Sequence, residues 1–358
     1  MLAQPLTAPP LDLSALPIRR KVPPPELLRE HELGGRKWSV ALPVTFTPFA
    51  SAQPCSARCV FCSETLWPRD SQRLSASLRP GPAYHEGLAR ALAALRGLPL
   101  GISLSGLEST DVPGWLLGVL DVLEAHEHHP EGLVEEKVLY SNAAGLSRET
   151  SGSALLPRLA SYGLTRVEIS RHHHEAARND RIMRFRPGQP IARQEVFEET
   201  ARTAREHVPV RLVCIVQRTG VATAEDVEAY LAWAVERLGV TDVVFREFSR
   251  LHGLYRSNGT QRTIERDRVA IESLLAPLLP GALRGDSRFE PLELTQGYYY
   301  WNVRMRWRGQ CDVTFEASDY QEMKARHRSG VIHKFVFHAN GNLCADWDPE
   351  REVLLRTA

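Results

Sequence analysis

An alternation of strand-like and helical segments up to Leu251 constrains the fold of this chain more than any other feature. The strand-like runs are rich in β-branched and aromatic residues, and they span Trp38–Phe49, Gly101–Thr110, Lys137–Gly145, Arg166–Glu175, Val210–Gly220 and Asp242–Leu251. The segments between them carry apolar residues at helical spacing. Strands that alternate with helices indicate parallel βα units, and right-handed crossovers wrap such units into a barrel. The sequence therefore predicts an α/β fold, a partial (β/α)6 TIM-like barrel.

The chain divides by composition into three expected parts. Residues 1–37 are rich in proline and predict an extended N-terminal arm, and residues 38–251 form the barrel core. Residues 252–358 have alternating, aromatic runs, which indicate a small antiparallel C-terminal extension that caps the substrate site. Within this extension, Asn340–Gly341 lies between two strand-like runs and predicts a type I′ hairpin turn.

Charge and hydropathy exclude several classes of protein. The net charge of the 358 residues is +1, which gives no electrostatic case for binding nucleic acid or an anionic membrane surface. No apolar run is long enough to span a bilayer, and the N-terminus lacks the basic-then-apolar order of a signal peptide. We therefore expect a cytoplasmic protein with reduced thiols, in which clustered cysteines bind metal or carry redox chemistry.

Half of the six cysteines lie in the stretch PCSARCVFCSE, at Cys55, Cys59 and Cys62. A structural zinc site normally has four ligands in two separated pairs, so this triplet would need a distant residue to complete such a site. An iron–sulfur cluster in its usual form also takes four cysteines. Three thiolates on a cubane would leave one iron open for another ligand.

Polar or otherwise unusual residues recur where the predicted strands end. In a parallel barrel the carboxyl ends of the strands share one rim, and catalytic groups collect there. Besides the cysteines, the residues at these strand ends are Glu108, Ser141, Asn142, Ser170, Gln217 and Arg246.

The segment CSARCVFC, with the aromatic Phe61 before its last cysteine, resembles the signature of the radical SAM superfamily. Other matches follow along the chain. The run SGLEST resembles the Gly-Gly-Glu motif after the second strand, with Gly106 and Glu108 retained and Leu107 as a departure. The remaining residues that the resemblance places near the cofactor are Ser141, Asn142, Ser170 and Arg246, and Gln217 is a further cofactor-binding candidate from its place at a strand end. The layout most resembles the branch that includes the molybdenum-cofactor cyclase and the peptide and sugar maturases.

The resemblance implies a [4Fe–4S] cluster held by the three cysteines and S-adenosyl-L-methionine (SAM) on its open iron. Reduction by an electron donor such as flavodoxin or ferredoxin would cleave SAM to a 5′-deoxyadenosyl radical, which abstracts hydrogen from the substrate. The expected substrate is a small polar molecule in specialised metabolite biosynthesis, and its radical could undergo epimerisation, cyclisation, elimination or C–C bond chemistry. The alternatives are a peptide-modifying radical SAM maturase and, from another class, a non-catalytic zinc or Fe–S binding module.

Candidate catalytic residues lie in two further places. The run SRHHHEAARND is either a solvated loop or brings His172 or His174 to the substrate for hydrogen bonding or proton transfer. Arg184 follows as a candidate for an anionic substrate group. Cys344 is either buried or donates a hydrogen atom to a product radical, as in radical epimerases. Cys311 and Cys344 are too few for a further cluster, so we expect no auxiliary cluster.

Overall fold

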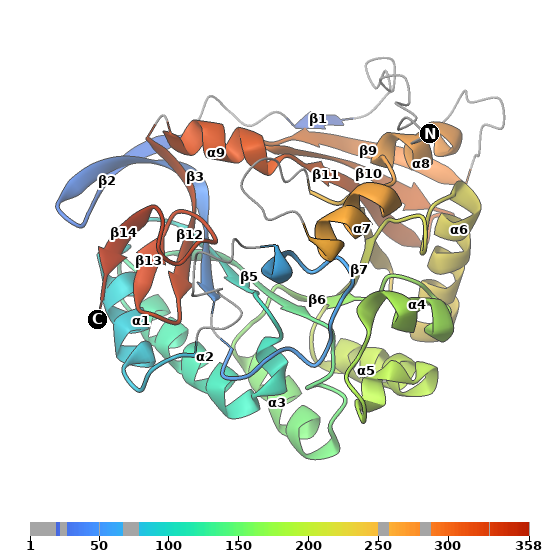
Figure 1. The fold of residues 1–358 in the computed structure, drawn as a ribbon, viewed down its shortest axis with the longest axis horizontal. Coiled ribbons are helices and arrows are strands. Elements are labelled where there is room, and N and C mark those ends of the chain that lie inside the picture. The colour runs from blue at the N-terminus through green and yellow to red at the C-terminus, as the bar shows by residue number, and fades with distance from the viewer. Residues whose placement is uncertain are drawn as a thin grey trace.

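The computed structural model describes residues 19–21, 27–49, 51–66, 79–249, 258–279, 288–328 and 330–357. The strands in these residues form one continuous 14-stranded sheet. The six predicted strands are found at its centre in sequence order, all parallel, with a helix on the outer side of most crossovers (Figure 1). They are β3 (Arg36–Phe49), β4 (Leu100–Leu104), β5 (Val134–Ser141), β6 (Arg166–Ser170), β7 (Val210–Ile215) and β8 (Asp242–Arg246). The predicted fold class is confirmed.

The C-terminal strands extend both edges of this array. β11 (Cys311–Ser318) pairs in parallel with β8, and β12 (Val331–His338) pairs in parallel with β3, so eight strands run in one direction. Helix α9 (Tyr320–Arg328) connects β11 to β12. The strand order is linear, because β11 and β12 have other strands on their outer sides in the described residues. The array is therefore an open barrel with eight parallel strands.

Antiparallel strands lie beyond both edges of the array. β10 (Tyr300–Trp307) pairs with β11 and with β9 (Phe289–Gln296), and β1 (Arg19–Lys21) follows β9 in parallel. At the other edge lie β13 (Asn342–Cys344) and β14 (Val353–Arg356), while β2 (Leu28–Leu33) pairs with the start of β3. The predicted N-terminal arm thus contains β1 and β2, and the predicted boundary at Leu251 lies outside the described residues.

The predicted turn at Asn340–Gly341 exists, but its type was predicted wrongly. The amide of Gly341 donates to the carbonyl of His338 at 3.0 Å, and the chain then enters β13. A type I′ turn needs positive φ at both central residues. Of this pair only Gly341 has it, with φ 80°. The loop is therefore a longer one in which glycine takes the left-handed position.

Side chains on the outer face of the array pack under helices and form the apolar core. The helices are α1 (Tyr84–Ala94), α2 (Pro113–Glu127), α3 (Glu149–Ser161), α4 (Ala176–Met183), α5 (Gln194–His207), α6 (Ala224–Trp233), α7 (Gly259–Asp267) and α8 (Ile271–Leu275). Alternate strand residues such as Ile102, Leu139, Ile169 and Phe245 are 0 or 1% exposed in this core. None of the described helices has both the length and the apolar character needed to cross a membrane.

The inner face of the array buries charged groups beside apolar side chains such as Val213 and Val244, whereas apolar layers fill a closed barrel. Glu168 of β6 is 2% exposed and lies 2.9 Å from Arg166 and 3.4 Å from Arg211. Arg246 of β8 lies 2.7 Å from Glu316 of β11 and 3.9 Å from Glu168. These pairs cross four neighbouring strands and satisfy most of the charges that the inner face buries.

Candidate functional site

The cysteine loop, residues 51–66, leaves the carboxyl end of β3 and lies against the end of α4. The amide of Arg58 donates to the carbonyls of Met183 and Arg184, at 3.0 and 3.1 Å, and the amide of Val60 donates to the carbonyl of Ile182. The guanidinium of Arg186 donates to the carbonyl of Cys55 at 2.8 Å. These backbone contacts fix the loop that carries the three thiols.

The three thiols are half-buried and lie on one loop. Among the described residues, His173, His174 and Glu175 form the one trio of His, Cys, Asp or Glu side chains whose ligand atoms lie within 4.8 Å of one another. The three cysteine sulfur atoms are therefore not all within 4.8 Å of one another. A tetrahedral zinc, with Zn–S bonds of about 2.3 Å, would hold its sulfur ligands roughly 3.8 Å apart, so at least two of these atoms would have to move closer together to bind it. Three thiols on one loop fit the donor set of an iron–sulfur cluster that takes its fourth ligand from elsewhere.

The surroundings favour the protonated form of these thiols when no cation is present. Burial and the charge of Glu108 raise the pKa of Cys55 to about 12. Burial and the charge of Glu64 raise the pKa of Cys62 to about 11, and burial also raises the pKa of Cys59. A bound cationic centre would offset both effects and displace the protons.

Asp111 connects the cysteine loop to the ends of β4 and β5. Its Oδ2 accepts from the amide of Ser56 at 2.7 Å, and its Oδ1 lies 3.3 Å from Arg148. Asn142, at the end of β5, donates through Nδ2 to the Ser56 hydroxyl at 3.0 Å and to Cys55 Sγ at 3.6 Å. The predicted site residue Asn142 is therefore next to the first cysteine. Asp111 did not stand out in the sequence, although it follows Glu108 by three residues.

Glu108 is 1% exposed, and both of its carboxylate oxygens are bonded within the protein. Oε1 accepts from the amide and hydroxyl of Thr110 and from the Ser141 hydroxyl, at 3.1, 2.6 and 2.8 Å, and Oε2 accepts from the Asn142 amide at 2.5 Å. Burial raises the pKa of Glu108 to about 7, although these hydrogen bonds act in the opposite direction. The structure thus gives Glu108 a local partner set that joins two strand ends, and SAM binding by Glu108 stays a prediction.

Gly106 lies against the ring of Phe49, the last residue of β3. Its φ is 91°, and a Cβ at this position would lie 1.7 Å from Cδ2 of Phe49. This close packing gives a structural reason for glycine that the sequence did not reveal. Whether Gly106 also contacts SAM stays a prediction.

The histidine run divides between the interior and the surface. His172 is 3% exposed, and its Nδ1 accepts from the Ile215 amide at 3.0 Å while its ring lies 4.9 Å from the ring of Phe61. Burial and the charge of Arg171 lower the pKa of His172 to about 3, so the ring is neutral. His174 is half-buried beside Glu175. Only His172 therefore approaches the cysteine loop, through Phe61.

The other predicted site residues are divided between the inner face of the array, a buried turn and the outer surface. Arg246 is engaged by Glu316 on the inner face. Ser170 ends β6 on the same face. Gln217 is fully buried in the turn after β7, where its backbone amide donates to the Val221 carbonyl. Arg184 is exposed at the end of α4. The structure thus brings Ser170 and Arg246 to the inner face and leaves Arg184 on the outer surface.

The remaining cysteines are fully buried. Cys344 lies in β13 opposite Val336 of β12, which pairs with Thr47 of β3, so its side chain shares the inner face. Its role as a hydrogen-atom donor stays a prediction. Cys311 begins β11 in the apolar core, and Cys214 packs in β7 with its thiol 3.6 Å from the His172 carbonyl oxygen.

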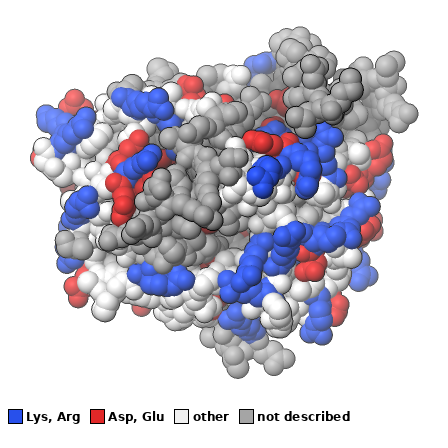
Figure 2. All heavy atoms as spheres, in the orientation of Figure 1, with Lys and Arg blue, Asp and Glu red and all other residues white. Residues whose placement is uncertain are grey.

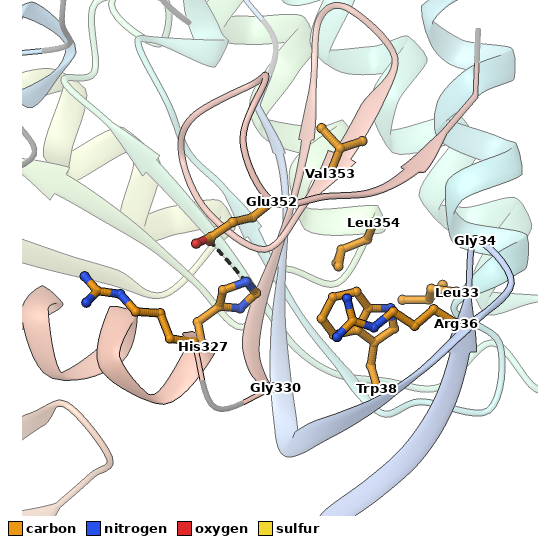
Figure 3. A pocket seen from close by; sticks show the side chains of 10 residues that line it. Leu33, Gly34, Arg36, Trp38, His327, Gly330, Glu352, Val353 and Leu354 are labelled. Atoms are coloured by element: carbon orange, nitrogen blue, oxygen red, sulfur yellow. Dashed lines mark ion pairs between the residues drawn. The ribbon is translucent and has the colours of Figure 1, made fainter.

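A cavity of about 720 Å³ lies away from the cysteine loop, between the β2–β3 hairpin, the end of α9 and β14 (Figure 3). Trp38, His327 and Glu352 line it, with His327 Nε2 3.2 Å from Glu352. Trp38 is near the start of β3, eleven positions before Phe49, which corresponds to roughly 35 Å of extended strand. The cavity is therefore separate from the candidate site.

No family model matches the sequence, and no curated protein matches it significantly. Among solved structures, the chain is similar to anSMEcpe with bound AdoMet and a Cp18Cys peptide, at 14% identity over 56% of this chain and 50% of that chain, with a TM-score of 0.43. It is also similar to Streptococcus suis SuiB bound to S-adenosylmethionine, at 14% identity over 85% of this chain and 60% of that chain, with a TM-score of 0.44. A third is coproporphyrinogen III oxidase from Escherichia coli, described as a radical SAM enzyme, at 13% identity over 73% of this chain and 66% of that chain, with a TM-score of 0.44. The similarity thus spans about half the length of the first of these structures.

Proposed function

We propose that this chain is a radical SAM enzyme. The observation that carries the proposal is the loop with Cys55, Cys59 and Cys62, which leaves the carboxyl end of a central parallel strand and is fixed by backbone contacts to α4. The three thiolates would hold a [4Fe–4S] cluster, which together with SAM would supply a 5′-deoxyadenosyl radical by reductive cleavage. Everything else that the reaction needs is positioning and exclusion of water, which the protein supplies.

The neighbouring side chains have defined tasks in this proposal. Asp111 and Asn142 hold the loop in place through Ser56. Phe61 packs on His172 and on Phe248, at centroid distances of 4.9 and 5.3 Å, and covers one side of the loop with apolar surface. Such a dry wall protects a reactive radical from water. The polar rim of the array would bind SAM next to the cysteine loop, where Asn142 Nδ2 lies 3.6 Å from Cys55 Sγ.

The proposal is tested on the anaerobically reconstituted full chain. We expect a brown protein with broad visible absorbance that releases 5′-deoxyadenosine when given dithionite and SAM. Cys59→Ala should lose both the colour and the product, whereas Cys311→Ala, which changes a buried cysteine outside the loop, should keep both. A colourless wild-type protein that contains one zinc per chain would contradict the proposal and favour a zinc-binding module.

The electron donor is proposed to dock on the face that carries the cysteine loop, α4 and α7. Lys and Arg side chains gather on this face (Figure 2). Arg58, Arg181 and Arg184 are exposed there, and none of them forms an ion pair with another described residue. Arg58 lies between two of the cysteines. A flavodoxin or ferredoxin with an acidic surface would be attracted to this cationic group.

Docking is tested by charge reversal with two reductants. Arg181→Glu combined with Arg184→Glu should slow flavodoxin-driven 5′-deoxyadenosine formation by about tenfold at low salt, and leave the dithionite-driven rate unchanged. The matched control is Arg96→Glu, an exposed arginine before β4 at the opposite end of the parallel strands. Equal flavodoxin-driven rates in the double variant and in the control would contradict docking on this face.

The substrate is proposed to be a small polar metabolite. The charged inner face of the array, with Glu168, Arg246 and Glu316, supports a polar substrate in preference to an apolar one. The alternative of a peptide substrate is tested by adding candidate precursor peptides to the reconstituted enzyme and following consumption of SAM.

A further inference from the structure

We propose that the inner face of the open barrel contains an anion-binding subsite centred on Lys334, which takes a carboxylate or phosphate group of the substrate. The inference rests on the proposed function only in assigning that anion to the substrate. The subsite itself follows from the position and surroundings of one buried ammonium group.

The side chain of Lys334 points into the barrel, because its neighbours in β12 point the other way. Phe335 and Phe337 belong to the apolar core under the helices, and the ring of Phe337 lies 5.2 Å from that of Tyr84 in α1. Successive strand residues face opposite sides of a sheet. Lys334 therefore lies on the inner face, beside Thr45 of β3 in the pairing register.

Lys334 is 5% exposed and has no acidic partner among the described residues. Its Nζ lies 4.6 Å from the ring centroid of Trp347 and 5.3 Å from that of Tyr320. Asp346, adjacent to Trp347 in the chain, is engaged by another lysine, since its Oδ2 lies 3.1 Å from Lys324 Nζ.

Burial of an unpaired ammonium is strongly unfavourable, and cation–π contacts offset only part of this penalty. The other cations of the inner face are paired with acidic side chains. Arg166, Arg211 and Arg246 each have carboxylate partners within 4.0 Å. Unlike these arginines, Lys334 has no carboxylate partner among the described residues. Its charge is therefore available to a ligand.

The subsite is continuous with the wall that leads to the cysteine loop. The ring of Trp347, beside the Lys334 ammonium, lies 5.6 Å from the ring of Phe49, and the cysteine loop begins two residues after Phe49. His338, on the same face of β12, is fully buried with Nδ1 unpaired and lies 5.9 Å from Phe49. A substrate held by its anion at Lys334 would thus extend along this wall toward the cluster.

Lysine offers a point charge with three donors and lacks the bidentate fork of arginine. It therefore selects for negative charge and accepts either a carboxylate or a phosphate. Trp347 and Tyr320 add flat apolar surfaces beside the charge, which favour an anionic group attached to a ring or a short carbon chain.

The test is the thermal unfolding of the reconstituted full chain, titrated with inorganic phosphate in one series and with malonate in another. Ionic strength is held constant with potassium chloride. The variants are Lys334→Met and, as a matched control, Lys37→Met, which removes an exposed lysine 3.9 Å from Glu30. Phosphate stabilises many proteins by exclusion from their surfaces, so the measured quantity is the difference between variants.

We expect at least one of the two anions to raise the melting temperature of the wild type and of Lys37→Met in a saturable way. In Lys334→Met the half-saturating concentration should increase by about tenfold or more. A response to phosphate alone identifies a phosphorylated substrate, and a response to malonate alone identifies a carboxylate. In anion-poor buffer Lys334→Met should be at least as stable as the wild type, because methionine removes the unpaired charge.

An anion response that is unchanged in Lys334→Met would overturn the subsite, and so would a wild type that responds to neither anion. The proposed enzyme activity is assessed separately, through dithionite-driven 5′-deoxyadenosine formation without substrate. This rate should be equal in Lys37→Met and the wild type. If no variant forms 5′-deoxyadenosine, the proposed function fails while the anion titration still decides the subsite.

Discussion

A side chain at position 106 would collide with Phe49, and Gly106→Ala should therefore destabilise the protein. A Cβ at this position would lie 1.7 Å from Cδ2 and 1.9 Å from Cε2 of Phe49. Phe49 is 2% exposed and is held by the ring of Trp347, at 5.6 Å, and by that of His338, at 5.9 Å. The ring therefore cannot move aside without displacing these neighbours, and we expect the backbone at the end of β4 to shift.

Two contributions add up in the expected loss of stability. The φ of 91° at Gly106 is unfavourable for any residue with a Cβ, by about 1–2 kcal/mol. Overpacking of a filled region adds about 1–3 kcal/mol. We expect Gly106→Ala to lower the free energy of unfolding by about 3 kcal/mol, measured by urea denaturation.

The matched control is Gly188→Ala. Gly188 has a φ of 81°, and a Cβ there would have no heavy atom within 4 Å, so this variant reports the backbone contribution alone. Adding Phe49→Leu to Gly106→Ala should recover part of the loss, with a coupling of about 1–2 kcal/mol between the two positions. Equal losses in Gly106→Ala and Gly188→Ala would refute the packing argument. A stable Gly106→Ala that binds SAM weakly would instead assign Gly106 to the ligand.

Three further substitutions test the site and its surroundings. Arg246→Met leaves Glu316 without its 2.7 Å partner on the inner face, and should cost about 3 kcal/mol of stability in urea denaturation. Asp111→Ala removes the acceptor of the Ser56 amide and should lower the iron content per chain after reconstitution. His172 stays neutral when folded, with a pKa lowered to about 3, whereas the unfolded chain gains a proton below its ordinary 6.5. Stability should therefore fall as pH decreases from 6.5 toward 3, by at most about 4 kcal/mol, and His172→Gln should remove this dependence.

Exposed residues of the same type serve as controls for these variants. Arg304→Met breaks an exposed pair with Asp312 and should change stability by less than about 1 kcal/mol. Asp121→Ala, which removes an exposed partner of Arg158, should leave the iron content unchanged. A pH dependence that persists in His172→Gln would assign that dependence to another group.

The central fold could be predicted because its signals are local. The alternation of strands and helices gave the six central strands, and the spacing of Cys55, Cys59 and Cys62 identified the loop after β3. The edges of the array could not be predicted in this way. The C-terminal strands alternate as an antiparallel sheet would, yet β11 and β12 join the array in parallel at opposite edges. That choice depends on long-range pairing, which the pattern within each strand does not record.

The candidate site shows the same division. Its chemistry at Cys55 follows from residue type and spacing, whereas the roles of other residues depend on contacts between distant parts of the chain. Gly106 matched a ligand motif in the sequence, but its Cβ position is filled by Phe49, 57 residues earlier. Asp111 resembled any turn residue, although it holds the Ser56 amide. Only the folded chain reveals such contacts.

The inner face explains why the open array can carry charge where a closed barrel packs apolar layers. Its sheet does not close, so side chains from β6, β8 and β11 must satisfy one another across the interior. Glu168 does this with three arginines on three strands. Lys334, on β12 near the other edge, has its ammonium beside the rings of Trp347 and Tyr320 and forms no ion pair with another described residue. The unpaired positive charge of Lys334 thus lies on β12, the strand next to β3. The cysteine loop leaves the barrel from β3, on the same side.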